Sequence, residues 1–379
     1  MSKPNDHSTE DTTTGVTYDR FYCSLQPVPE PVFTPEVLGN PERFIRLVDN
    51  SNKWVNGTTL HYYFFDEPTD GRNLQFTDGT VHFRSWLGND TQKNFVRQAF
   101  QVWMAVGIGL DFKEVTSRQE AEIRIGFEQG DGSWSYIGRD ILTHGPDERT
   151  MNFGWDLTLE RRPADTPTHE IGHTLGAPHE HQNPNSGIVW NEEAVYGALA
   201  KPPNSWNREK TFFNIIRKLD PSTVEGSKWD PNSIMHYPFA KGLIKEPTRY
   251  SDGLTPAGGI SALDNDWVRK FYPVLTDGDH AELKALKSVP LDAEAGQQRN
   301  FVIQPEATRY YEFRTFGKSD AVMVLFEDGS GETRYLTADD DSGKERNAYV
   351  KVKLFKGHRY ILRVRLCYKE AHNVAVMMW

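Results

Sequence analysis

The chain has 379 residues, of which 37% are hydrophobic and 12% aromatic, and its 43 Lys and Arg stand against 53 Asp and Glu. This apolar content excludes wholesale disorder. A formal net charge of −10 without a basic cluster excludes nucleic acid as an expected partner. Membrane insertion is not expected either, because no apolar run approaches the roughly 18 residues that a spanning helix needs.

The first 50 residues are predicted to be a disordered start followed by an extended arm. Prolines deny this stretch a regular helix or a central strand; they are Pro27, Pro29, Pro31 and Pro35. The N-terminus lacks the basic start and the apolar stretch of a secretory signal. We therefore expect a protein that is cytoplasmic as made or exported by a non-classical route.

Residues 51–274 are predicted to form one domain in which strands and helices interleave. The patterns predict strands at 58–65, 110–115, 122–127 and 150–155, and helices at 92–106, 163–175, 208–219 and 264–272. The fold class expected for this domain is α+β.

Residues 277–379 are predicted to be a separate β-sandwich domain, which follows a polar break at 276–279. Short strands with turn residues between them are expected at 309–316, 321–326, 348–355, 359–366 and 373–379. The chain has only two cysteines, Cys23 and Cys367, so no disulfide framework is expected. The sequence does not indicate which oligomeric state the protein has.

The most informative segment is a cluster of histidines between residues 169 and 181. His169 and His173 are four residues apart, so on a helix their imidazoles share one face and can bind one zinc ion. Glu170 lies beside them, where it can take a proton from zinc-bound water. Gly176 is expected to end the helix with a positive φ, which lets His179 return as the third ligand. Three histidines leave one position open, as a catalytic zinc site requires.

A second element lies downstream, at residues 233–237. Met235 is expected to form an apolar floor under the three imidazoles. Tyr237, two residues later, can reach the metal or a developing oxyanion.

Together these residues resemble the astacin branch of the metzincin metallopeptidases. The resemblance covers about residues 54–273 and includes Glu180 after the third histidine and the Trp-Ser-Tyr segment at 134–136. It implies a two-lobed zinc peptidase with a mixed sheet, an active-site helix and a cleft that accepts protein or peptide substrates. Animal astacins hold this domain with two disulfides, whereas here it contains no cysteine. The chain therefore resembles disulfide-free microbial relatives.

The resemblance also implies a mechanism and a mode of substrate binding. Zinc is held by His169, His173 and His179, with Glu170 as the general base and acid and Tyr237 as an oxyanion stabiliser. Residues 150–155 resemble the rim strand that pairs with an extended substrate. The family often favours acidic residues after the scissile bond, and Lys241 and Lys245 are the candidates to recognise them.

Cys23, in the predicted arm, is a candidate fourth ligand. A thiolate is a good zinc ligand, so Cys23 can occupy the open position and hold the enzyme latent as a zymogen. The alternative is an ordinary free thiol.

Two functions are weighed for the whole chain. The first is a zinc-dependent endopeptidase. The alternative is a catalytically silent, zinc-containing binding protein that acts through its β-sandwich. Glu170 and Tyr237 favour the enzyme, because a silent protein need not retain them.

Overall fold

The computed structural model describes residues 22–26, 52–76, 78–221, 228–275, 280–291, 293, 297–317, 321–329, 333–340, 342–343, 347–366 and 374–379. Most of the predicted arm, the predicted break at 276–279 and Cys367 lie outside these residues. The division at 51–274 and 277–379 stays a prediction. Within the described residues, no helix combines the length and the apolar character that crossing a bilayer requires.

The first lobe of the α+β region, residues 52–178, is built on a five-stranded mixed sheet of order β4-β1-β5-β7-β6. Its strands are β1 (Thr59–Phe64), β4 (Asp111–Glu114), β5 (Ile123–Gly126), β6 (Trp134–Ser135) and β7 (Met151–Asn152). β1 pairs in parallel with β4 and β5, whereas β6 runs antiparallel to β7 at the sheet edge. The strand expected at 150–155 is therefore the short, interior β7. The edge position belongs to β6.

Two helices pack against this sheet and against each other. Helix α3 (Asp90–Ala105) is capped by the Asn89 side chain, which accepts a hydrogen bond from the Gln92 amide. The buried face of α3 includes Phe100, whose ring stacks on Tyr62 of β1 at 4.1 Å. Helix α4 (Asp165–Thr174) carries the first two histidines. Short helical turns complete the lobe; they are η1 (Gly138–Thr143) and η2 (Leu157–Leu159).

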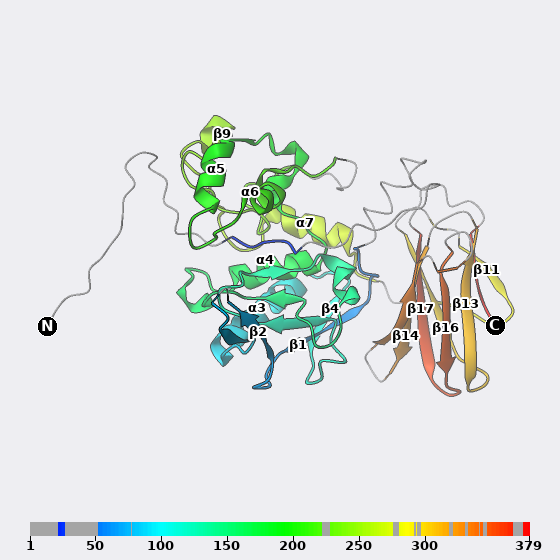
Figure 1. Cartoon of the computed structure of the whole chain (residues 1–379). Helices are drawn as coiled ribbons and strands as arrows, with labels where there is room; N and C mark the ends of the chain where they lie inside the picture. Colours follow the sequence, from blue (N-terminus) through cyan, green and yellow to red (C-terminus); the bar gives the residue numbers. More distant parts are fainter. Residues whose placement is uncertain are drawn as a thin grey trace.

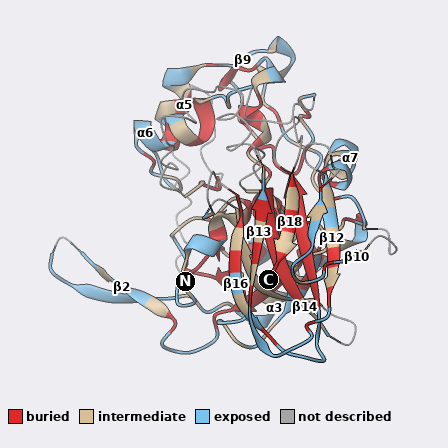
Figure 2. Cartoon of the chain, turned by 90° about the vertical axis from the view of Figure 1, so that its right-hand side faces the viewer, coloured by how far each residue is buried: buried red, intermediate tan, exposed pale blue. Residues whose placement is uncertain are grey.

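An exposed hairpin projects from the first lobe, as Figure 2 shows at the end labelled β2. It pairs β2 (Gly71–Gln75) with β3 (Val81–Ser85) in antiparallel register.

A second lobe, residues 179–254, has its own aromatic core and faces α4 from the other side (Figure 1). Its elements are η3 (Glu180–Gln182), η4 (Pro184–Ser186), β8 (Val189–Trp190), α5 (Glu192–Leu199), α6 (Arg208–Thr211), η5 (Phe212–Ile216), β9 (Ile244–Glu246) and η6 (Thr248–Tyr250). The helix expected at 208–219 is a single α-turn that continues as the π-helical η5. Helix α7 (Ala262–Phe271) then returns to the first lobe, where Val268 and Phe271 join its core.

The C-terminal region is a β-sandwich of two sheets, as expected (Figure 1). One sheet has the order β10-β12-β17-β14-β15 and the other β11-β18-β13-β16. The strands are β10 (His280–Glu282), β11 (Ser288–Pro290), β12 (Gln298–Ile303), β13 (Arg309–Phe316), β14 (Ala321–Asp328), β15 (Thr333–Asp339), β16 (Tyr349–Leu354), β17 (Arg359–Leu366) and β18 (Ala375–Met378). Residues from both sheets fill one apolar core between them.

The sandwich contacts the peptidase-like region through the entry segment at residues 53–56. Val55 is buried in a small cluster with residues of β14 and β17. Two arginines of β17 donate hydrogen bonds to main-chain carbonyls of this segment, Arg363 to Asn56 at 2.8 Å and Arg365 to Trp54 at 3.0 Å. The same segment holds α4, because the Trp54 indole donates to the Thr174 carbonyl at 2.8 Å.

These contacts predict that Arg365→Ala destabilises the protein. The side chain is 2% exposed, and its loss leaves buried carbonyls without a charged donor, which costs about 1.5–3 kcal/mol. We expect the melting temperature to fall by about 3 °C or more. Arg334→Ala, at an exposed position of β15, is the matched control. Equal melting temperatures for the two variants would contradict this role.

Candidate metal centre

Helix α4 and the turn after it place three histidines around one point. His169 and His173 lie one turn apart on α4, and their rings approach at 4.8 Å between centroids. Gly176 ends the helix with a φ of 94°, a conformation that glycine adopts at little cost. The chain then reverses, and His179 packs its ring against His173 at 4.6 Å. The structure thus brings the three histidines together as the sequence predicts, and their role as zinc ligands stays a prediction.

A glycine between the two helical histidines makes room for Met235. A Cβ built on Gly172 would lie only 2.4 Å from the Met235 sulfur. Met235 is buried and packs directly under the helix, as expected for a floor beneath the imidazoles. The turn that carries it is clamped by Asp264 of α7, which accepts hydrogen bonds from the Ser233 hydroxyl at 2.6 Å and the Ile234 amide at 2.8 Å.

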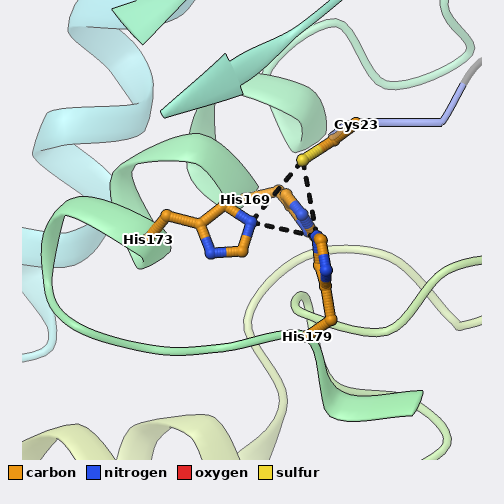
Figure 3. Close-up of side chains that lie close together, drawn as sticks. All are labelled: Cys23, His169, His173 and His179. Carbon is orange, nitrogen blue, oxygen red and sulfur yellow. Dashed lines mark hydrogen bonds between the residues drawn. The ribbon is translucent and has the colours of Figure 1, made fainter. Parts of the chain in front are cut away.

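Cys23 joins the three histidines in a buried group of four donors (Figure 3). One ligand atom from each residue lies within 4.8 Å of all the others. The Cys23 sulfur is 3.5 Å from Nε2 of His173 and 3.4 Å from Nε2 of His179. These two nitrogens are themselves 3.1 Å apart. The arm therefore reaches the histidines, as the latch interpretation expected.

Hydrogen bonds orient two of the histidine rings as metal ligands require. Nδ1 of His169 lies 2.7 Å from the Ile234 carbonyl, and Nδ1 of His173 lies 2.7 Å from the Ala177 carbonyl. These contacts turn each Nε2 inward, and Nε2 of His169 is buried with no hydrogen-bond partner among the described residues.

Burial sets the protonation states of the same donors. Burial lowers the pKa of His169 to about 4. It also lowers the pKa values of His173 and His179, and neighbouring imidazoles lower these two values further. All three rings are therefore neutral at pH 7, which is the form that binds metal. Burial, and then the Glu170 carboxylate, raise the pKa of the Cys23 thiol well above its usual range. A thiolate at this position therefore needs a cation beside it, and the donor set fits zinc.

Glu170 contacts the donor cluster but is not one of its four donors. Its side chain is fully buried, and Oε2 accepts a hydrogen bond from the Cys23 sulfur at 3.6 Å. Oε1 has no hydrogen-bond partner among the described residues. Burial raises the pKa of the Glu170 carboxyl group to about 8.

Tyr237 approaches the cluster from the opposite side. Its hydroxyl lies 2.5 Å from Nε2 of His179 and donates a hydrogen bond to the Cys23 carbonyl at 2.7 Å. The tyrosine is 4% exposed, and burial raises its pKa well above the usual range, so the phenol is a neutral donor.

Glu180, the other residue of the resemblance, supports the loop that carries Met235. Its carboxylate accepts hydrogen bonds from the Asp230 amide at 2.9 Å and the Asn183 side chain at 3.0 Å. Glu180 therefore stabilises the chain next to the histidines through Asp230 and Asn183.

Residues 22–26 lie between the two lobes, beside α4 (Figure 1). The Ser24 amide donates to the Ser133 carbonyl at 3.2 Å, immediately before the edge strand β6. Across the cleft, the Tyr22 amide donates to the Asn204 side chain at 3.0 Å and the Leu25 amide to the Asn214 side chain at 2.9 Å. The arm segment therefore contacts the first lobe at Ser133, next to the edge strand β6, whereas β7 is interior, which corrects the expectation that residues 150–155 form the rim strand. Ser133, Asn204 and Asn214 have no sequence motif that could have identified them as contacts.

A cavity of about 560 Å³ opens beside the donors. It is lined by Cys23, Trp155, Asp156, Leu159, Glu160, Arg161, Asp165, Thr166, His169, Glu170, Ser233, Ile234, His236, Tyr237, Pro238, Thr255, Pro256 and Gly258. Lys241 and Lys245 are not among these residues. Lys241 instead forms an exposed ion pair with Asp252 at 2.7 Å. The candidates named for recognition of acidic substrates are therefore not in the cavity wall.

Comparison with known proteins points to one family. The model of the Astacin peptidase family matches residues 73–248. Human Tolloid-like protein 1 is 28% identical over 177 residues, which cover 45% of this chain and 14% of that protein. Metalloendoproteinase 1-MMP of Arabidopsis thaliana is 30% identical over 144 residues, which cover 33% of this chain and 39% of that protein. The chain thus spans well under half the length of either relative.

A solved structure of myroilysin is similar in fold, with a TM-score of 0.50 and 29% identity. The match covers 60% of this chain and 98% of the myroilysin chain. The family match over residues 73–248, this fold and the three-histidine cluster together support an astacin-like metzincin.

Proposed function

We propose that the protein is a zinc-dependent endopeptidase that hydrolyses peptide bonds in proteins, and that Cys23 holds it latent. The observation that carries this proposal is the convergence of three neutral, buried imidazoles with a buried carboxyl group and a phenol. Each of these groups has a defined task in peptide hydrolysis.

His169, His173 and His179 would hold the zinc ion. When bound, zinc supplies the Lewis acidity that lowers the pKa of a water molecule and polarises a peptide carbonyl. Glu170 takes the proton at its free Oε1 and later returns it to the leaving amine.

Tyr237 is assigned to the peptide carbonyl under attack. Its hydroxyl already donates to a main-chain carbonyl, that of Cys23, beside the three histidines. A substrate carbonyl in the same place would receive the same hydrogen bond, which strengthens as negative charge develops on its oxygen.

Cys23 is assigned to latency. Bound to zinc as a thiolate, Cys23 would take the place of the water molecule that hydrolysis needs, and its sulfur already lies 3.6 Å from the Glu170 carboxylate. Latency would end when the arm leaves the cleft. The alternative of a silent binding protein is not favoured, because the groups needed for hydrolysis stand at the metal centre.

Full-length Cys23→Ala should therefore be more active than the unmodified chain. We expect about tenfold or more, because losing even ~1.4 kcal/mol of sulfur–zinc binding changes the occupancy of the latch tenfold. Cleavage of a denatured protein mixture or of a quenched fluorescent peptide provides the measurement. Cys367→Ala is the control, since it removes the other thiol of the chain. Equal activity of the two variants would show that Cys23 does not restrain the enzyme.

Glu170→Gln, introduced into the Cys23→Ala chain, should lower kcat/KM by about 10²–10⁴. The amide keeps the shape of the carboxyl group but cannot accept the proton, so zinc content should stay near one ion per chain. A chelator should abolish cleavage by the parent, and added zinc should restore it. Glu193→Gln, at an exposed carboxylate of α5, is the matched control. Undiminished cleavage by the Glu170 variant would refute the assigned mechanism.

A further inference from the structure

The arm is bound in the cleft chiefly as a main chain. Its amide groups at Tyr22, Ser24 and Leu25 donate to Asn204, Ser133 and Asn214, and its carbonyl at Cys23 accepts from Tyr237. Such contacts do not depend on side-chain identity, so another extended peptide can make them. Residues 22–25 therefore mark a path that a substrate chain can follow across the metal centre.

One side chain of this segment, besides Cys23, is held by a pocket of its own. The Tyr22 ring is 7% exposed and enters the aromatic core of the second lobe. It stacks on Phe239 at 5.9 Å with an interplanar angle of 24°, and it contacts Tyr237 at 5.2 Å and Trp206 at 6.5 Å between ring centroids. Aromatic side chains prefer such offset and tilted neighbours.

The far end of the pocket carries a polar acceptor. The Tyr22 hydroxyl donates a hydrogen bond to the main-chain carbonyl of Pro238 at 2.9 Å. A phenol satisfies this carbonyl, whereas a phenyl ring leaves it without that donor. The pocket is thus matched to a tyrosyl side chain in both shape and hydrogen bonding.

The pocket wall is anchored independently of the arm. Phe239 packs against Trp190 of β8 at 4.7 Å and against His181 at 5.2 Å. Tyr237 follows the Met235 turn that Asp264 holds. The second lobe itself thus supplies contacts that hold this wall in addition to those of Tyr22.

We propose that the pocket filled by Tyr22 is a substrate-specificity pocket, which accepts an aromatic and preferentially a tyrosyl side chain close to the scissile bond. The proposal rests on the proposed peptidase function. In the latent chain Tyr22 occupies the pocket, so the arm blocks the metal with Cys23 and the specificity pocket with the neighbouring residue. The pocket adjoins the cavity of about 560 Å³, whose wall includes Tyr237 and Pro238 but neither Tyr22 nor Trp206.

The test uses the full-length double variant Cys23→Ala, Tyr22→Gly, in which both the metal position and the pocket are released. Peptides of one parent sequence carry Tyr, Phe or Ala at each position from two before to two after the cleaved bond. At one fixed position, kcat/KM should be about tenfold or more higher for Tyr than for Ala, because the ring is buried. Phe should fall between them, a few-fold below Tyr. A ratio of Tyr to Ala below about two at all four positions would overturn the proposal.

Variants of the wall connect this preference to the pocket. Trp206→Ala, and the milder Trp206→Leu in case the first unfolds, should bring the ratio of Tyr to Ala towards one, with melting curves to verify folding. Tyr310→Ala, an exposed aromatic on β13 of the sandwich, should leave the ratio unchanged. A folded Trp206 variant that keeps the full ratio would overturn the assignment to this pocket.

The same experiment separates this inference from the function on which it rests. Chelator-sensitive cleavage without an aromatic preference refutes the pocket and leaves the peptidase intact. Absence of chelator-sensitive cleavage of every peptide refutes the peptidase and, with it, the pocket.

Discussion

The peptidase-like region depends on one constraint, which is that three neutral imidazoles must converge at a buried position. Burial provides the neutral state, and carbonyls of Ile234 and Ala177 turn two of the rings inward. The surroundings are arranged for this purpose. Gly172 admits Met235 beneath the helix, and Asp264 secures the turn that carries Met235. Helix α4, the turn at Gly176 and the turn that carries Met235 therefore support one another.

The same constraint explains why a peptide arm can control the site. The buried donor cluster lies between two lobes, and residues 22–26 lie beside it with hydrogen bonds to both sides. We propose that the Cys23 sulfur takes the place of the attacking water, and Tyr22 packs into the aromatic cluster beside it. In our account, latency and substrate recognition thus use the same surface.

The local part of this site is predictable from sequence, and the long-range part is not. The spacing of His169 and His173, the glycine at 176 and the return of His179 are consequences of helix geometry within eleven residues. The chemistry of a thiol ahead of a zinc motif predicts Cys23 as a candidate ligand, and the structure places it beside the three histidines. The order of the sheet was not predictable, since a strand pattern does not state which neighbour a strand takes. For that reason the rim was expected at β7 and lies beside β6.

Contacts of Asn204 and Asn214 with the arm are equally hidden, because they join residues more than 180 positions apart. The β-sandwich was predicted from strand length and turn residues, whereas its attachment through Arg363 and Arg365 was not.

The claim on which the account depends is that one metal ion is shared by the three histidines and Cys23. X-ray absorption at the zinc edge of the full-length protein tests it directly. The account predicts one sulfur at about 2.3 Å and nitrogen neighbours at about 2.0–2.1 Å, and a shell of nitrogen and oxygen alone would contradict it.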